Sequence, residues 1–287
     1  MPNKPAALFG VLGHPLAHTM SPAMFSEILP SVAPGSAYLA WDIPPAELDR
    51  FFNAATVLHI AGLSVTIPYK QTILRYLYHR SPAVAAIGAA NCLVLREGLW
   101  HGHNTDADAF RESLKSRRIE PRSALVLGAG GAARAAIYAL EAMACPSITV
   151  AARRAATVAR ESYFANHTVV PFDDQLTRLA EDVELVVNAT PLGMYPNSEQ
   201  SPLATGFRTG QVAYDIVYNP RPTRFLTLAK EAGAIPIDGL EMLARQAAIA
   251  LSLFTGARVA WEKFLKAAEN GLRSQAANES QPTEKRL

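Results

Sequence analysis

The 287-residue sequence has little cysteine, little excess charge and no long apolar run, and each shortage excludes a class of protein. Its two cysteines, Cys92 and Cys145, lie far apart in apolar stretches, so they form neither a disulfide framework nor a cysteine-rich zinc site. Lys and Arg number 27 against 25 Asp and Glu, and the net charge of +2 disfavours a general binder of nucleic acid or membrane surfaces. No apolar run reaches the ~18 residues of a membrane span, and the first ten residues lack the pattern of a secretion signal.

What is present fits a two-domain α/β protein of a reducing cytoplasm. Hydrophobic residues make up 49% of the chain and charged residues 18%, which is a globular composition. At roughly 100–200 residues per domain, the length predicts two domains. Short β-branched or apolar runs alternate with helix-length stretches, and this alternation is typical of parallel strands joined by crossover helices.

In the first half of the chain, proline marks the starts of the predicted helices. These helices begin near Pro22 and Pro45 and after Pro68, and another is predicted over residues 106–117. Glu97 and Gly98 are expected to join two strands as a hairpin. The strands of this half are predicted at residues 7–12, 38–43, 63–67, 91–96 and 99–104.

The second half begins with a predicted strand at 124–127, a glycine loop and an alanine-rich helix to about residue 144. Further strands are predicted at residues 148–152, 168–170, 185–188 and 212–217. The chain is then expected to be helical from Glu241 to about Leu272, and these last helices should return to pack on the first domain. Residues 274–287 are polar, and we expect them to form a frayed tail.

The run SALVLGAGGAAR at residues 123–134 reads as a strand, a Gly-x-Gly-x-x-Ala turn and a helix start. Gly128 permits the tight turn, Gly130 lets the backbone approach a pyrophosphate, and Ala133 allows close packing of helix on strand. The free N–H groups of the helix start would bind the phosphates. A glycine pattern alone could be an ordinary turn, but its place between a strand and a helix predicts a dinucleotide site.

The residues after the next strand indicate which dinucleotide binds. Folds that bind NAD usually place Asp or Glu there, about 20 residues beyond the glycines, to hold the ribose 2′-hydroxyl. This chain has Arg153 and Arg154 at that point, with no acid. Guanidinium groups attract a 2′-phosphate and bind it in bidentate fashion, so the pair favours NADP. The alternative is a solvated arginine pair at a helix start.

Three short motifs of the first half place polar side chains at the ends of elements. Ser21 is expected to cap a helix whose first residue is Pro22, and with Thr19 it would offer hydroxyls to a carboxylate. Lys70 follows a strand that a proline ends, where open α/β sheets bind ligands. Asp106 stands at a helix N-terminus, which stabilises its negative charge. The ordinary alternatives are helix caps for Ser21 and Asp106 and a solvated Lys70.

Taken together, the motifs resemble the shikimate dehydrogenase family, in one order over roughly residues 8–262. The matching elements are GHPLAHTMSP (13–22), VTIPYK (65–70), Asn91, NTD (104–106), GAGGA (128–132), NATPLGM (188–194), YDIVYNP (214–220) and DGLEMLARQ (238–246).

The resemblance implies an enzyme that reversibly reduces 3-dehydroshikimate to shikimate with NADPH and without a metal, in chorismate and aromatic amino-acid biosynthesis. It implies that Lys70 and Asp106 form the catalytic pair. The residues implied to bind the substrate are Thr19, Ser21, Thr66, Asn91, Asp106, Tyr218 and Gln246. The residues implied to bind the cofactor are Gly128, Ala129, Gly130, Gly131, Ala132, Arg153, Arg154, Ile216 and Gly239.

The fold implied by the resemblance has two α/β domains. A substrate domain of residues 1–104 and 239–273 is completed by the C-terminal helices, and a Rossmann-type NADP domain of residues 105–238 is inserted between its parts. The polar tail would be residues 274–287. A cytoplasmic monomer or homodimer is expected, with a small-molecule substrate and neither a nucleic-acid nor a membrane partner.

The chemistry of a ketone reduction agrees with these roles. Hydride arriving at the carbonyl carbon builds negative charge on the oxygen, which a Lys70 ammonium would stabilise and protonate, while Asp106 would orient that ammonium. Thr19 stands where serine is common and adds a methyl group at the carboxylate end. A quinate/shikimate dehydrogenase that prefers NAD is therefore one alternative. A non-catalytic, dinucleotide-binding regulatory protein is another, which the presence of both Lys70 and Asp106 disfavours.

Overall fold

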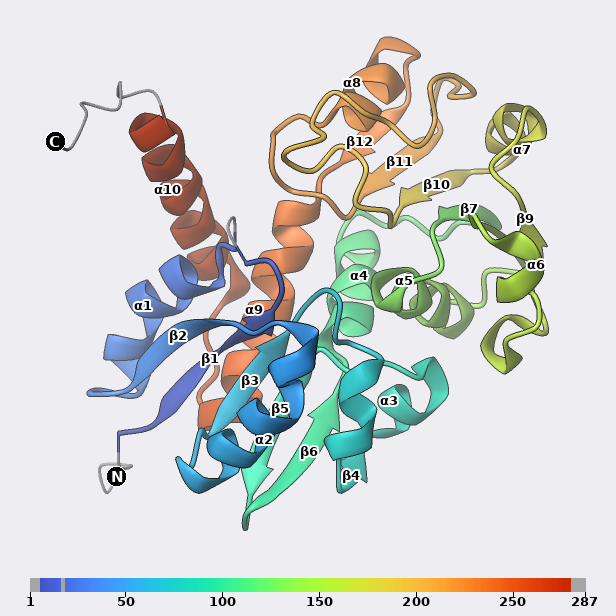
Figure 1. Cartoon of the computed structure of the whole chain (residues 1–287). Helices are drawn as coiled ribbons and strands as arrows, with labels where there is room; N and C mark the ends of the chain where they lie inside the picture. The colour runs from blue at the N-terminus through green and yellow to red at the C-terminus, as the bar shows by residue number, and fades with distance from the viewer. Residues whose placement is uncertain (1–5, 17–18, 280–287) are drawn as a thin grey trace, which may run out of the picture.

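The computed structural model describes residues 6–16 and 19–279 and divides them between two sheets with helices around each (Figure 1). The chain builds the first sheet, then the second, and finally returns to the first through its last two helices. The fold is therefore the expected one, with a Rossmann-type domain inserted into a domain that the C-terminal helices complete. Within the described residues, no helix is long and apolar enough to cross a membrane.

The first sheet has the strand order β2-β1-β3-β5-β6-β4 and is mixed. Its strands are β1 (Leu8–Gly13), β2 (Ala37–Asp42), β3 (Gly62–Val65), β4 (His79–Arg80), β5 (Cys92–Arg96) and β6 (Leu99–His103). The helices and 3-10 turns beside it are α1 (Ser21–Val32), η1 (Pro45–Glu47), α2 (Leu48–Val57), η2 (Thr72–Tyr76) and α3 (Pro82–Ile87). The predicted hairpin joins β5 to β6, and its turn residues Glu97 and Gly98 both have positive φ, as a tight hairpin turn requires.

The second sheet is parallel throughout, in the order β12-β11-β10-β7-β8-β9. Its strands are β7 (Ser123–Leu127), β8 (Ser147–Ala151), β9 (Thr168–Val170), β10 (Leu185–Asn188), β11 (Val212–Asp215) and β12 (Ile235–Ile237). Its helices and 3-10 turn are α5 (Gly131–Ala142), α6 (Ala155–Val158), η3 (Ser162–Phe164), α7 (Gln175–Asp182) and α8 (Arg224–Glu231). The strand order reverses between β7 and β10, and such a switch point is where doubly wound sheets bind nucleotides.

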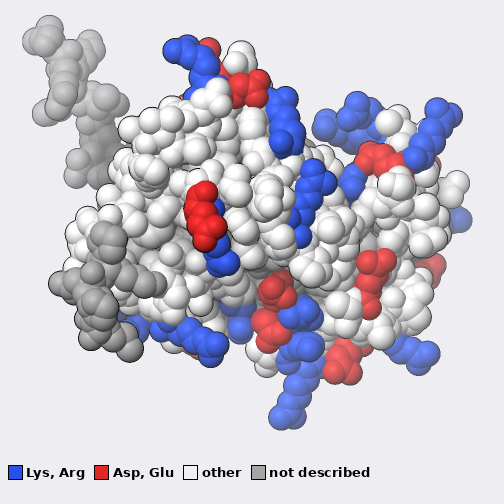
Figure 2. Space-filling model, turned by 90° about the horizontal axis from the view of Figure 1, so that it is seen from below, with Lys and Arg blue, Asp and Glu red and all other residues white. Residues whose placement is uncertain are grey.

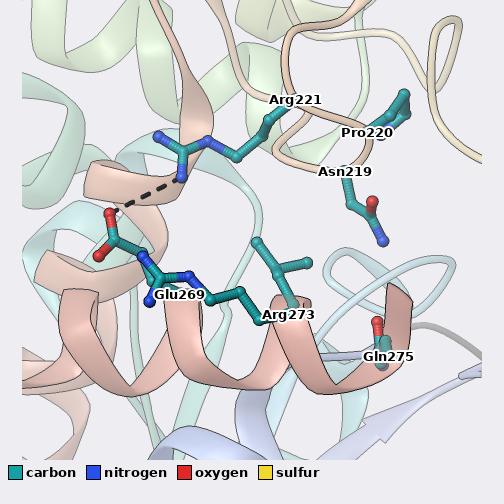
Figure 3. A pocket seen from close by; sticks show the side chains of 7 residues that line it. Asn219, Pro220, Arg221, Glu269, Arg273 and Gln275 are labelled. Carbon is teal, nitrogen blue, oxygen red and sulfur yellow. Dashed lines mark ion pairs between the residues drawn. The ribbon is translucent and has the colours of Figure 1, made fainter. Parts of the chain in front are cut away.

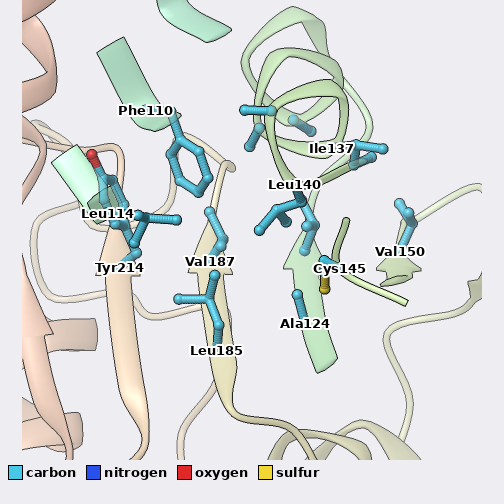
Figure 4. Close-up of a cluster of buried hydrophobic side chains, with 14 of the residues drawn as sticks. Phe110, Leu114, Ala124, Ile137, Leu140, Cys145, Val150, Leu185, Val187 and Tyr214 are labelled. Atoms are coloured by element: carbon cyan, nitrogen blue, oxygen red, sulfur yellow. The ribbon is translucent and has the colours of Figure 1, made fainter. Parts of the chain in front are cut away.

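The core of the second domain lies between this sheet and two helices that cover one face of it. Phe110 of α4 (Thr105–Lys115) and Leu140 of α5 are fully buried against Val187 of β10 and Tyr214 of β11 (Figure 4). The strands are nearly continuous apolar runs because both faces of a parallel sheet are covered.

The C-terminal helices complete the core of the first domain. Leu251 of α9 (Gly239–Thr255) and Phe264 of α10 (Trp261–Glu279) share one buried cluster with Met24 and Phe25 of α1. The expected return of the last helices to the first domain is thereby confirmed. Helices α4 and α9 both run between the two domains and pack on each other (Figure 1).

Several local predictions were wrong. The segment after Pro68 forms the 3-10 turn η2 instead of an α-helix, and β3 ends at Val65, two residues early. Strands β4 and β12 were not predicted, because two or three residues are too few for an alternation to show. Helix α10 continues to Glu279, past the expected start of the tail, since the run SQAAN suits a helix. Residues 280–287 lie outside the described part.

Candidate active site

A partly buried ion pair joins Lys70 to Asp106. Lys70 follows β3 after Pro68, and Asp106 lies in the first turn of α4, so the two side chains come from neighbouring elements at one edge of the first sheet. The Lys70 Nζ lies 2.6 Å from Asp106 Oδ2, and the side chains are 17% and 8% exposed. The pair therefore faces a restricted amount of water, where a charge-assisted hydrogen bond is strong.

The cap of α4 is Asn104, not Asp106. The Asn104 Oδ1 accepts a hydrogen bond from the backbone N–H of Ala107 at 3.2 Å. This contradicts the ordinary reading of Asp106 as a helix cap and leaves both of its carboxylate oxygens available for side chains. Asn104 also donates to the carbonyl of Ala89 at 3.0 Å, which fixes the start of α4 against the strand-side loop.

Asn91 holds the second oxygen of the Asp106 carboxylate. Its Nδ2 donates to Asp106 Oδ1 at 2.8 Å and to Thr105 Oγ1 at 2.9 Å, and its Oδ1 accepts from the backbone N–H of Thr105 at 2.6 Å. The Thr105 hydroxyl in turn lies 3.4 Å from Gln246 Oε1 of α9. Four of the predicted side chains, namely those of Lys70, Asn91, Asp106 and Gln246, thus form one connected polar cluster.

Thr19 and Ser21 lie on a segment that is fastened to β2. The Asp42 carboxylate accepts from the backbone N–H of Leu16 at 3.0 Å and contacts His14 Nδ1 at 2.6 Å. The backbone hydrogen bond from Leu16, together with His14, lowers the pKa of Asp42 below its ordinary value. The stretch from His14 to Leu16, which precedes Thr19 and Ser21, is therefore held by a carboxylate outside the cluster.

Ser21 was expected to cap α1, and this was wrong. It is the first residue of the helix, Met20 is the residue before it, and no side chain caps this end. The Ser21 side chain is buried at this end of the helix. Thr66 and Tyr218 were the remaining predicted substrate residues. The Thr66 N–H bonds to the Leu12 carbonyl beside β1, and burial raises the pKa of Tyr218, which a hydrogen bond with the Met20 backbone opposes.

The glycine loop has the shape that a pyrophosphate needs. Gly128 has a φ of +114°, which only glycine adopts without strain. Gly130 is the residue before α5, a Cβ built on it would meet no atom within 4 Å, and no described side chain caps the helix. The first N–H groups of α5 therefore have no side-chain partner among the described residues, and the small, half-exposed Ala129 and Ala132 flank this helix start. These residues fit a dinucleotide.

Arg153 and Arg154 lie just beyond the carboxyl end of β8, where we expected the group that reads the ribose. Both are exposed, and no side chain of the described residues pairs with either guanidinium. Two adjacent, exposed guanidinium groups at this point fit a 2′-phosphate.

Ile216 and Gly239 meet each other directly. The carbonyl of Ile216, which follows β11, occupies the space that a side chain at Gly239 would need. Protein atoms therefore leave no room for a side chain at Gly239. Gly239 is required because α9 starts against the end of β11.

Nearby, the loop after Tyr218 and helix α10 form a pocket of about 360 Å³. Its lining includes Asn219, Arg221 and Arg273, and Arg221 reaches Glu269 of α10 at 3.9 Å (Figure 3). The lysine–aspartate pair does not line it, so this pocket is separate from the polar cluster. On the face seen in Figure 2, acidic and basic side chains are interspersed, which offers nucleic acid no continuous basic surface there.

Two residues that the structure shows in contact with predicted or neighbouring groups were not identified as important from the sequence. Thr105 bridges Asn91 and Gln246, and it stands inside the motif NTD, so the motif itself was the signal. Arg134 is a buried charge at the end of the glycine-loop motif, and only its neighbours in space reveal it. No three His, Cys, Asp or Glu side chains within the described part are arranged to hold a metal ion. Both cysteines are free and buried, which raises the pKa of each thiol.

An uncapped glycine-loop helix facing a lysine–aspartate pair defines the chain as a dinucleotide-dependent oxidoreductase. Known proteins narrow this class. The profile of the shikimate dehydrogenase substrate binding domain matches residues 11–93. The NADP(+) shikimate dehydrogenase of Trichormus variabilis is 37% identical over 260 residues, 86% of this chain and 90% of that protein. That of Moorella thermoacetica is 38% identical over 87% of this chain and 88% of its own. The chain belongs to the shikimate dehydrogenase family.

Solved structures share the whole fold. Shikimate 5-dehydrogenase from Thermus thermophilus, in complex with NADP(H) and shikimate, is 38% identical with a TM-score of 0.82, covering 92% of this chain and 99% of that chain. Quinate dehydrogenase from Corynebacterium glutamicum, in complex with NAD, is 28% identical with the same TM-score, covering 92% and 99%. The fold is therefore common to proteins named shikimate dehydrogenase and to one named quinate dehydrogenase.

Proposed function

We propose that this protein catalyses the reversible reduction of 3-dehydroshikimate to shikimate with NADPH, a step of chorismate and aromatic amino-acid biosynthesis. The observation that carries the proposal is the Lys70–Asp106 pair, 2.6 Å apart, beside the glycine loop of a Rossmann-type domain. Relatives that are 36–38% identical to this protein over most of the chain are named for this reaction. The reaction needs no metal.

Lys70 and Asp106 act on the carbonyl group. NADPH, when bound, supplies the hydride that the ketone carbon receives. Negative charge then grows on the carbonyl oxygen, and the Lys70 ammonium stabilises it and donates the proton that completes the alcohol. Asp106 holds the ammonium in place with one carboxylate oxygen, while Asn91 fixes the other oxygen. The reverse reaction uses the same groups, with Lys70 accepting the proton.

The substrate is held by neutral side chains. Asn91 and Gln246 lie in the cluster around Asp106, and the hydroxyls of Thr19 and Ser21 serve the carboxylate end at the start of α1. Thr66 and Tyr218 complete the set. Neutral donors and acceptors suit a triol, because an analogue that lacks one hydroxyl would leave a partner unpaired.

The glycine loop and the two arginines hold the cofactor. The uncapped start of α5 binds the pyrophosphate, and Arg153 and Arg154 bind the 2′-phosphate that distinguishes NADP from NAD. Ile216 lies at the nicotinamide end, with Gly239 packed behind it. The free, buried cysteines fit a reducing cytoplasm, where the protein acts as a monomer or homodimer.

Steady-state rates with shikimate and quinate, each with NADP and NAD, test the proposal. Shikimate with NADP should have the highest kcat/KM of the four combinations. A preference for quinate with NAD would overturn it and would favour the alternative that Thr19 raises. Absence of turnover in all four combinations would favour a regulatory protein.

A further inference from the structure

Arg134 is a buried charge that the reaction described above does not use. It lies one turn inside α5, beyond the glycine loop, and its side chain is only 7% exposed. A guanidinium withdrawn from water must be fully bonded to be tolerated. The identity of its partners therefore shows what it holds together.

Three partners come from its own domain. The guanidinium forms an ion pair with Glu161, and it lies 4.8 Å from the ring centroids of both Tyr163 and Phe164. The Tyr163 hydroxyl also donates to the Arg134 carbonyl at 2.6 Å. These contacts fix the guanidinium relative to α5.

The fourth partner comes from the other domain. The Gln71 amide group faces this guanidinium, and in the orientation that satisfies both groups its oxygen accepts from Arg134 Nε at 2.8 Å and from Nη2 at 3.2 Å. Gln71 directly follows Lys70. A Cβ built on Gly88, at the end of α3 in the same domain, would lie 3.6 Å from Arg134 Nη1. Arg134 thus reaches across the boundary between the two domains.

A second contact lies one turn earlier on the same helix. A Cβ built on Gly131 would lie 2.9 Å from the Cβ of Lys70, so the backbone of Gly131 packs against the Lys70 side chain. Positions 70 and 71 therefore rest on α5 at two points, Gly131 and Arg134. Two points fix a direction as well as a position, and α5 is the helix whose N-terminus faces the cofactor phosphates.

We infer that Arg134 is a positioning residue, which through Gln71 aligns Lys70 with the bound dinucleotide. The inference rests on the proposed function. Hydride transfer and protonation occur at adjacent atoms of one carbonyl group, so the lysine must be set relative to the cofactor, and a misplacement of 1 Å can cost about 100-fold in rate. A glutamine at position 71 supplies the hydrogen bond without placing a second carboxylate beside Lys70.

The experiment measures kcat and KM for shikimate and NADP in Gln71→Leu, Arg134→Met and the double variant. Gln71 is exposed, so Gln71→Leu should fold even if the buried arginine proves necessary for stability. Each single change should lower kcat about 10-fold and leave both KM values within about 3-fold. The kcat of the double variant should be no lower than that of the less active single variant, because both changes remove the same hydrogen bond between Gln71 and Arg134. Gln71→Glu, which keeps an oxygen toward Arg134, should restore most of the activity lost in Gln71→Leu.

Arg208→Met is the matched control, since the Arg208 guanidinium donates to the carbonyls of Glu181 and Val183, both within the cofactor domain. It should leave kcat unchanged, whatever its effect on the melting temperature. The inference is overturned if Gln71→Leu keeps the wild-type kcat, or if the two single effects multiply in the double variant. A wild-type enzyme inactive with shikimate would instead refute the proposed function, so the two failures are distinguishable.

Discussion

The substrate side and the cofactor side of the site differ in how their polar groups are satisfied. On the substrate side, Lys70, Asn91 and Asp106 are bonded to one another, with distances between 2.6 and 2.8 Å. On the cofactor side, the first N–H groups of α5 have no side-chain cap, and Arg153 and Arg154 pair with no described side chain.

This contrast follows from what each side does. A group that transfers a proton must keep one orientation through the reaction, so its neighbours fix it beforehand. A group that binds a phosphate gains most when its donors are not already used by protein. The catalytic side is therefore recognised by its internal bonds, and the binding side by the lack of them among the described residues.

Removing the ammonium of the fixed pair should have the largest effect. Lys70→Ala should lower kcat by roughly 10²–10⁴-fold, the range typical of general acid–base groups, with a modest change in KM. Steady-state kinetics with shikimate and NADP measure it. Lys115→Ala changes an exposed lysine of α4 and serves as the control. An unaltered kcat in Lys70→Ala would refute the role of Lys70 and with it the contrast.

Removing the free arginines should affect binding instead of turnover. Arg153→Ala and Arg154→Ala should each raise the KM for NADPH about 10- to 100-fold, since a hydrogen bond to a charged group contributes roughly 1.5–3 kcal/mol. The KM for NADH should change little, because NADH lacks the 2′-phosphate. Arg160→Ala provides an exposed arginine from the same region as a control. Equal effects on both cofactors would mean that the pair does not read the phosphate.

Substitutions at two adjacent glycines test the cofactor side and the substrate side of the site separately. Gly130→Ala adds a methyl group where no protein atom lies within 4 Å, so it should leave the melting temperature unchanged and weaken NADPH binding several-fold. Gly131→Ala adds the same group 2.9 Å from the Lys70 Cβ, so it should also lower kcat. Fluorescence titration with NADPH and steady-state kinetics separate the two outcomes. The same effect from both substitutions would contradict the geometry.

Asp215 is a second buried carboxylate, in the cofactor domain, and it can be compared with Asp106. Its buried carboxylate accepts from Asn188, Val217 and Thr223, yet burial raises its pKa to about 7. The folded state therefore binds this proton more tightly than the unfolded state, and stability should fall by a few kcal/mol at most between about pH 4 and pH 7.

Urea unfolding of wild type and Asp215→Asn at pH 4.5 and 8 checks this expectation. The variant should lose less stability than the wild type as the pH rises, since its side chain does not ionise. An equal loss in both proteins would assign the pH dependence to other groups. The partners of Asp215 thus serve the fold, whereas those of Asp106 serve the reaction.

Local patterns were enough to predict the strand, glycine turn and helix that place Gly128 and Gly130. Each of those features depends on neighbours in the chain, so a short stretch of sequence contains the whole signal. The pairing of Lys70 with Asp106 came from the resemblance to a family, because no local pattern shows that two distant motifs meet. The alternative reading of Asp106 as the cap of α4 stayed open for a related reason: Asn104 and Asp106 are both good caps, and geometry alone chooses between them.

Arg134 could not be found from the sequence, since its partners Gln71 and Glu161 lie on separate segments and neither stands out in composition. The close approach at Gly239 could not be found from the sequence either, because the neighbour that excludes a side chain there is the carbonyl of Ile216. Both cases depend on packing between segments that lie far apart in the chain.

The chain leaves the first domain and re-enters it at almost the same place. Arg117, after α4, bonds to Glu241 near the start of α9 at 2.6 Å, and Arg245 reaches the Ser116 hydroxyl at 3.2 Å. The chain therefore enters and leaves the cofactor domain at two adjoining points. Because the two connections lie side by side, the insertion adds a whole domain without separating the two parts of the first domain.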